Sequence, residues 1–167
     1  MRRTRVTVLA AVALAAASGC APVPGSLEGS ISASFDLRYD HLELVADEGP
    51  SLVIRYLDDV SYDVVAYDGT NTVAELRIGG PLDGAVAGEP IDVTDLVELD
   101  RFVMVLTPDN EVVQDGRTYP DVYVAEVTFD ELGTAAGEAC AGRFRVIFQD
   151  GTTLRGTFDG DLVPPSF

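Results

Sequence analysis

Residues 143–158 read RFRVIFQDGTTLRGTF, and this stretch decides the fold class. Apolar and polar side chains alternate on both sides of Asp150-Gly151, and a period of two is typical of strands with one buried face. A two-residue turn at Asp150-Gly151 would divide the apolar side chains between both faces of the hairpin. A three-residue loop, Gln149-Asp150-Gly151, keeps them on one face and gives Gly151 a left-handed conformation. We therefore predict the three-residue loop, with one apolar face formed by Phe144, Val146, Phe148, Leu154 and Phe158.

Similar alternation recurs along the rest of the chain. It predicts strands at Ser30–Tyr39, 42–46, 52–57, 60–67 and 73–78. Two further runs, 101–107 and 121–129, are apolar on both faces and therefore predict central strands that are covered on each side. Short helical turns are expected at Asp92–Leu99 and after Thr128, which has capping-box spacing to Glu131.

These patterns predict one all-β domain over residues 30–167. Strands at short spacing, separated by Gly, Asp and Pro, favour an antiparallel β-sandwich of about eight or nine strands. A closed β-barrel is the alternative, because alternation alone does not distinguish the two.

Charge excludes one class of partner. The chain of 167 residues has 28 acidic and 11 basic residues; all of the basic residues are arginines, and all of the acids follow Cys20. From Cys20 onward eight arginines face 28 acids, which gives a net charge of −20. Such a body repels phosphate backbones, so nucleic-acid binding is excluded, and it avoids anionic lipid surfaces unless it is tethered to them.

The N-terminus has the layout of a secretory signal peptide. Residues 1–20 read MRRTRVTVLAAVALAAASGC, in which three arginines precede an apolar run from Val6 to Ala17. Twelve residues are too few for a helix that spans a bilayer, which needs about 20. We therefore predict that residues 1–19 are a signal peptide and that the protein is exported.

The end of this segment, Ala17-Ser18-Gly19-Cys20, resembles the lipobox of bacterial lipoproteins, although that family usually has Leu at the position of Ala17. The resemblance implies cleavage before Cys20, a lipid on its thiol and an acylated N-terminus. Ala21 is not the Asp that retains enterobacterial lipoproteins in the inner membrane, which favours the outer membrane in a host that has one. The alternative is cleavage after Ala17, which would leave Cys20 free to form a disulfide with Cys140.

Residues 20–29 are expected to be the lipidated N-terminus and a flexible tether, because APVPGSLEG at 21–29 contains two Pro and two Gly. Two or three acyl chains hold a protein stably at a membrane, whereas one holds it only marginally. The partners expected are thus the membrane, through Cys20, and an unknown envelope protein or glycan.

Motifs for catalysis are absent from the sequence. There is one His, His41, which we interpret as a surface residue, and there is no G-x-S-x-G elbow or glycine-rich phosphate loop. Cys140 is interpreted as a small buried apolar residue. Calcium is the one ion that the composition favours, but no acid cluster matches a calcium loop. The clusters are Asp58-Asp59 with Asp63, Asp92 with Asp95, and Asp159 with Asp161.

The sequence therefore predicts a lipid-anchored, extracytoplasmic envelope protein that acts as a binding or structural module. No catalytic residue, metal ligand or cofactor is assigned, and the only site residue is Cys20, for lipid attachment. Two other classes remain open: a carboxylate-based hydrolase on the same scaffold, and a calcium-dependent adhesion or carbohydrate-binding module.

Overall fold

The protein is a β-sandwich. The computed structural model describes residues 25–46, 51–64, 67–80, 82 and 85–165. One sheet has five strands in the order β1-β11-β10-β9-β5, and the other has four in the order β2-β3-β4-β6, with β7 and β8 forming a separate ribbon. The strands are β1 Ser26–Glu28, β2 His41–Ala46, β3 Leu52–Tyr62, β4 Tyr67–Ile78, β5 Pro90–Asp92, β6 Val97–Phe102, β7 Met104–Leu106, β8 Val112–Gln114, β9 Val122–Glu131, β10 Ala139–Phe148 and β11 Thr153–Asp161.

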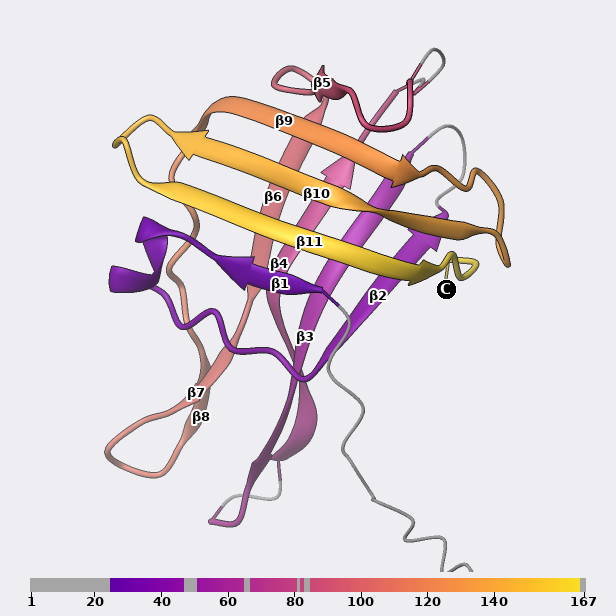
Figure 1. Ribbon diagram of the computed structural model, residues 1–167. Coiled ribbons are helices and arrows are strands. Elements are labelled where there is room, and N and C mark those ends of the chain that lie inside the picture. Colours follow the sequence, from indigo (N-terminus) through magenta and orange to yellow (C-terminus); the bar gives the residue numbers. More distant parts are fainter. Residues whose placement is uncertain (1–24, 47–50, 65–66, 81, 83–84, 166–167) are drawn as a thin grey trace, which may run out of the picture.

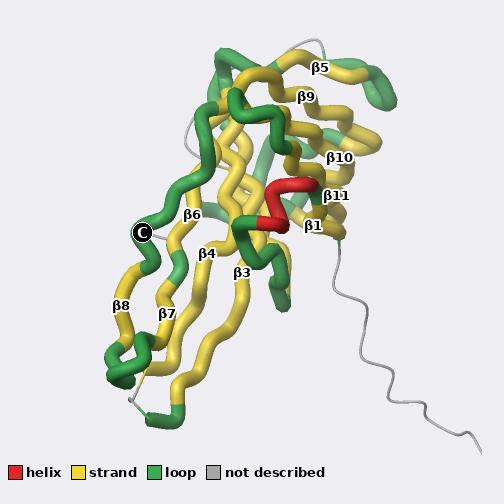
Figure 2. Tube along the Cα trace, turned by 90° about the vertical axis from the view of Figure 1, so that its left-hand side faces the viewer, coloured by secondary structure: helices red, strands yellow, loops and turns green. Residues whose placement is uncertain are grey.

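The two sheets pack face to face with their strands crossing steeply, so that β9, β10 and β11 run across β2, β3 and β4 (Figure 1). Neighbouring strands in each sheet are antiparallel. This arrangement confirms the predicted all-β class and the sandwich, because in the described part of the chain the sheets do not close into a barrel. The ends of β3 and β4 and the β7–β8 ribbon extend beyond the five-stranded sheet (Figure 2).

The β10–β11 hairpin has the predicted loop. The Phe148 amide donates to the Thr152 carbonyl at 2.9 Å, so that Gln149, Asp150 and Gly151 form the loop, and Gly151 has φ 82°. Val146 lies opposite Leu154. The predicted apolar face is buried throughout, with each of its five residues at most 4% exposed. Both the loop and the register are therefore confirmed.

The core lies between this face and the inner face of β2, β3 and β4. Tyr56 is fully buried there, and its hydroxyl donates to the Thr157 carbonyl at 2.9 Å. This approach requires glycine at Gly156, because a Cβ at that position would lie 2.4 Å from the Phe144 ring and 2.6 Å from the Tyr56 oxygen. The Tyr56 hydrogen bond thus joins the two sheets across the core.

Several predicted elements are wrong. Ser30–Tyr39 is not a strand: Ser30–Ala33 forms a 3₁₀ helix, and the chain then turns back toward β2. The predicted strand 60–67 is interrupted by a turn at Asp63 and Val64, which joins β3 to β4. From Phe35 to Tyr39 buried and exposed positions still alternate, although these residues form no strand.

The expected helices and one of the two expected central strands differ from the structure. The other run, 121–129, forms most of β9, which lies between β10 and β5, although Tyr123 on it is 66% exposed. Asp92–Leu99 contains the end of β5, a turn and the start of β6, and β9 continues through Thr128 to Glu131. Residues 101–107 divide between β6 and β7 at the margin of the fold, where Phe102 is 46% exposed. The described residues form eleven strands instead of eight or nine, because four of them have three residues and show too little alternation to be predicted.

The predicted tether is too long. Ser26–Glu28, within the predicted tether of residues 20–29, forms β1 and pairs with Arg155–Thr157 of β11. The Ser26 hydroxyl lies 2.9 Å from that of Thr157. The pairing occurs because β11 would otherwise present an unpaired edge to solvent. The part of the predicted tether that the structure describes, from Gly25 onward, therefore contributes a strand to the domain.

Candidate functional site

The structure tests only some of the site predictions. Cys20 and the predicted signal peptide lie outside the described residues. Cys140 is a free cysteine with no exposed surface, and burial raises the pKa of its thiol to about 11. A thiol with that pKa is protonated at neutral pH and is a poor nucleophile. Cys140 thus is the buried apolar residue that the sequence predicts. His41 is half-buried at the start of β2.

The acidic clusters do not converge on a cation. In the described ranges, no group of three or more His, Cys, Asp or Glu side chains could hold a metal ion. Some aspartates instead stabilise turns: Asp92 accepts hydrogen bonds from the amide and hydroxyl of Thr94, and Asp150 does the same for Thr152. No helix in the described part of the chain is long and apolar enough to cross a membrane.

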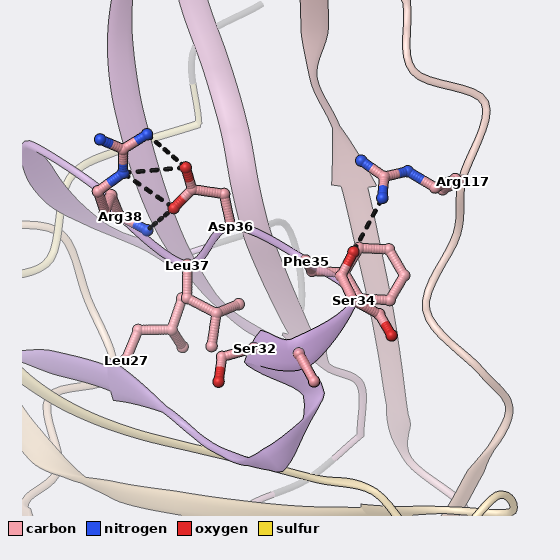
Figure 3. Close-up of a pocket in the computed structure, with 9 residues that line it drawn as sticks. Leu27, Ser32, Ser34, Phe35, Asp36, Leu37, Arg38 and Arg117 are labelled. Atoms are coloured by element: carbon pink, nitrogen blue, oxygen red, sulfur yellow. Dashed lines mark hydrogen bonds and ion pairs between the residues drawn. The ribbon is translucent and has the colours of Figure 1, made fainter.

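A hollow lies at the end of the sandwich where β3, β4 and β7 extend. It consists of two adjoining depressions of about 630 and 340 Å³, the first of which is shown in Figure 3. Asp36, Arg38 and Arg117 line both. We call the whole the Phe35 cleft, and its other lining residues used below are Phe35, Asp58 and Arg101.

Two identical local motifs border the Phe35 cleft. In Asp36-Leu37-Arg38 and in Asp115-Gly116-Arg117, the arginine amide and guanidinium both donate to the aspartate two residues earlier. Arg117 also donates from Nη1 to the Ser34 carbonyl at 2.8 Å, which joins the second motif to the segment that carries Phe35 (Figure 3). In each motif the hydrogen bonds join residues that are two apart in the sequence. These bonds orient the planar guanidinium at the rim of the cleft.

Arg101 is the unusual residue of the cleft, because its side chain is only 3% exposed. Its guanidinium carbon lies 5.2 Å from the centre of the Phe35 ring, and its Nη1 lies 3.0 Å from Asp115 Oδ2. Its Nε is buried and has no hydrogen-bond partner among the described residues. A buried donor without a partner costs about 1–3 kcal/mol, and more where the group is charged. Arg101 is therefore a charged group with unused hydrogen-bonding capacity.

Two carboxylates of the cleft have their pKa values displaced in opposite directions. The hydrogen bonds from Arg38 lower the pKa of Asp36. Burial, together with the neighbouring Asp40, raises the pKa of Asp58. In many hydrolases two carboxyl groups of one site have pKa values shifted apart in this way. The group with the raised pKa acts as the acid, and the other stays ionised.

Sequence reasoning missed this cleft. It placed Phe35 in a strand and Arg101 at the start of another, and it selected no arginine for a role. One signal was available: the chain has only eight arginines after Cys20, and two of them stand in the same Asp-x-Arg spacing. The bend after Ser30–Ala33 brings the two Asp-x-Arg motifs together. Alternation of apolar and polar residues does not predict that bend.

Comparison with known proteins gives no further assignment. No family model matches the chain, and no curated protein or solved structure matches it either. The function must therefore be inferred from the residues themselves.

Proposed function

We propose that this protein is a lipid-anchored, extracytoplasmic binding module of the cell envelope, held at the membrane by Cys20 and without catalytic activity. The observation that carries the proposal is the order of residues 1–20, in which a basic segment and an apolar run lead into Ser18-Gly19-Cys20. In a host with two membranes, Ala21 favours the outer one.

The position of the first strand supports this anchoring. Cys20 lies six residues before Ser26, the first residue of β1. Six residues span at most about 20 Å. A lipid on Cys20 would therefore hold the domain directly at the bilayer surface.

The Phe35 cleft is the proposed ligand site of the module. Its rim carries the fixed guanidinium groups of Arg38 and Arg117, and Arg101 offers a buried donor without a partner. The ligand chemistry that suits these groups is an acceptor oxygen, such as a carboxylate or carbonyl of an envelope peptide or glycan.

Lipidation is tested by the intact mass of the mature protein and by detergent partitioning of membrane fractions, with Cys20→Ser as the matched control. We expect a mature chain that begins at Cys20, carries acyl chains and partitions into detergent, whereas Cys20→Ser stays in the aqueous phase. A soluble mature protein that begins at Ser18 would reject the proposal.

Denaturing thiol labelling without reductant should modify Cys140, because its one possible partner in the chain is blocked.

Ligand binding is tested by side-chain NMR of the arginine Nε–H groups during titration with acetate and with an acetylated dipeptide. We expect the Arg101 signal to shift. The control is Arg55, whose guanidinium already bonds Glu43 and Glu75 at 3.0 and 2.7 Å and whose signal should stay in place. Equal shifts for the two residues would mean nonspecific ion binding.

A carboxylate-based hydrolase is the second candidate, favoured by the opposed pKa shifts of Asp36 and Asp58 in one cleft. It predicts turnover of chromogenic glycosides or esters that Asp58→Asn abolishes. Absence of turnover across such a panel, together with the Arg101 shift, favours the binding module.

A further inference from the structure

We propose that the ligand of the Phe35 cleft is a zwitterion, a short peptide with both ends free, which places its carboxylate at Arg101 and its ammonium group at Asp58. This inference rests on the proposed function of the cleft as a ligand site. It adds the second charge of the ligand and the separation between its two charges.

Arg101 and Asp58 belong to strands that are two apart in the same sheet. Asp58 on β3 lies opposite Asn71 on β4, and Thr72 on β4 lies opposite Phe102, the residue of β6 that follows Arg101. Both charged residues line the same depression of about 340 Å³. The central strand β4 therefore separates a cationic end of the cleft from an anionic end.

The Arg101 end of the cleft has a surplus of positive charge. Arg101 and Arg117 share one carboxylate, that of Asp115, at 3.0 and 2.7 Å. Arg101 is the buried member of this group, and its Nε donor has no hydrogen-bond partner in the described ranges. A ligand carboxylate would balance the second guanidinium and satisfy this buried donor.

The Asp58 end has a surplus of negative charge. Burial raises the pKa of Asp58, and the charge of the neighbouring Asp40 raises it further. Arg38 offsets this only in part, because its guanidinium is hydrogen-bonded to Asp36 (Figure 3). Within the described residues, no arginine forms an ion pair with Asp40 or Asp58. An ammonium group would supply the missing cation and three hydrogen-bond donors.

The floor between the two ends is neutral. Asn71 is buried there, and its side-chain amide is already hydrogen-bonded to the backbone of Met104. The apolar side chains that line the same depression are Val60, Val73, Val103 and Val105. A ligand that reaches both ends therefore needs charges at its ends and small apolar groups between them.

The strand spacing sets the length of the ligand. Strands two apart in a sheet lie about 10 Å apart, so the ammonium and carboxylate groups of a ligand that reaches both ends must be several bonds apart. A dipeptide is about 7 Å long when extended, and a hydrogen bond at each end covers the remaining distance. The alanine dipeptide, dialanine, has the required charges and small apolar side chains.

The test compares three ligands that differ only at their ends, with the Cys20→Ser protein. They are dialanine, N-acetyl-dialanine, which lacks the ammonium group, and dialanine amide, which lacks the carboxylate. Dissociation constants come from calorimetry, and the Arg101 Nε–H signal in NMR reports contact with the cleft. Because the ligand is varied at the carboxylate end, the buried Arg101 stays unchanged and the fold is not disturbed.

We expect dialanine to bind about tenfold more tightly than either blocked peptide, because each end contributes a hydrogen bond to a charged group. Asp58→Asn should lower the affinity for dialanine to that for N-acetyl-dialanine. The matched control is Asp59→Asn, which removes the same charge from the adjacent, exposed residue, and it should leave the tenfold preference in place.

Three results would overturn the inference. Equal affinities for dialanine and N-acetyl-dialanine, with the Arg101 signal shifted by both, would leave the cleft a carboxylate site and reject the zwitterion. A preference for dialanine that survives Asp58→Asn, or that is lost equally in Asp59→Asn, would show that Asp58 does not bind the ammonium group. If none of the three peptides shifts the Arg101 signal, the proposed function of the cleft fails, and this inference fails with it.

Discussion

The two faces of the β10–β11 hairpin differ in what holds them and in what they leave unused. The inner face buries Phe144, Val146, Phe148 and Leu154 against the opposite sheet. The outer face carries Arg143, Arg145 and Arg155, and Glu126 lies opposite Arg145 while Glu28 lies opposite Arg155. One register produces both faces, because successive side chains of a strand point to opposite sides.

This difference separates residues that stabilise the fold from residues that do not along a single element. Changes on the inner face should lower the free energy of unfolding, and changes on the exposed outer face should leave it almost unchanged. The predictions below break or sharpen that division.

The largest effect is expected for Phe148→Ala on the inner face. Phe148 is 1% exposed and stacks on Tyr119 with ring centres 5.9 Å apart. Loss of a buried phenyl ring should lower the free energy of unfolding by about 3–5 kcal/mol, as measured by urea denaturation. The matched control is Arg145→Ala, three residues away on the outer face, which should change it by less than about 1 kcal/mol. Similar losses for both variants would reject the division.

Cys140, also on the inner side of β10, should make stability depend on alkaline pH. Burial raises the pKa of its thiol to about 11, whereas the unfolded value is about 9. The folded protein therefore holds the proton more tightly, and this contribution is present below pH 9 and lost as the pH rises toward 11. Two pKa units correspond to about 2–3 kcal/mol.

The measurement for Cys140 compares the unfolding free energy of the natural protein with that of Cys140→Ala from pH 8 to about pH 11. The difference between the two isolates the thiol from the buried tyrosines Tyr56 and Tyr119, whose pKa values are also raised. A constant difference across that range would show that the thiol does not titrate differently on folding.

The loop between the two strands provides a smaller effect. Gly151 has φ 82° and no atom within 4 Å of the position a Cβ would take, so backbone conformation alone limits substitution there. Gly151→Val should lower the free energy of unfolding by about 1–3 kcal/mol, whereas Gly151→Asn should lower it much less. Thermal melts of the two variants give the comparison, and equal small losses would be inconsistent with a left-handed residue.

The smallest effect is expected on the outer face. Arg155 lies between Arg145 on β10 and Glu28 on β1, so Arg155→Thr removes one repulsion and one attraction. The free energy of unfolding, measured by urea denaturation, should therefore change by less than about 0.5 kcal/mol. A loss as large as that of Phe148→Ala would be inconsistent with an exposed position.

The inner face could be predicted from the sequence, since Gly151 and the five apolar residues admit one register that buries them all. The same register places Arg143, Arg145 and Arg155 on the exposed side of the hairpin, so their outward position also follows from the sequence.

Other features could not be predicted, for physical reasons. β1 has three residues and owes its existence to the edge of β11, which no local pattern reports. The Phe35 cleft depends on the bend after Ser30–Ala33 and on a long-range contact. Arg117, which is 83 residues from Ser34 in the sequence, donates a hydrogen bond to the Ser34 carbonyl. Long-range pairing of this kind leaves no periodic signal in either segment.

The separation of the two faces is tested most directly by chemical modification of arginine in the folded Cys20→Ser protein. Phenylglyoxal is applied to the protein, and modified residues are quantified by mass spectrometry. Arg38, whose side chain is 88% exposed at the Phe35 cleft, is the internal control. We predict that Arg143, Arg145 and Arg155 on the outer face react as Arg38 does, whereas Arg101, whose side chain is 3% exposed, is protected. Protection of Arg143, Arg145 and Arg155 to the same degree as Arg101 would contradict the register that places them on the outer face.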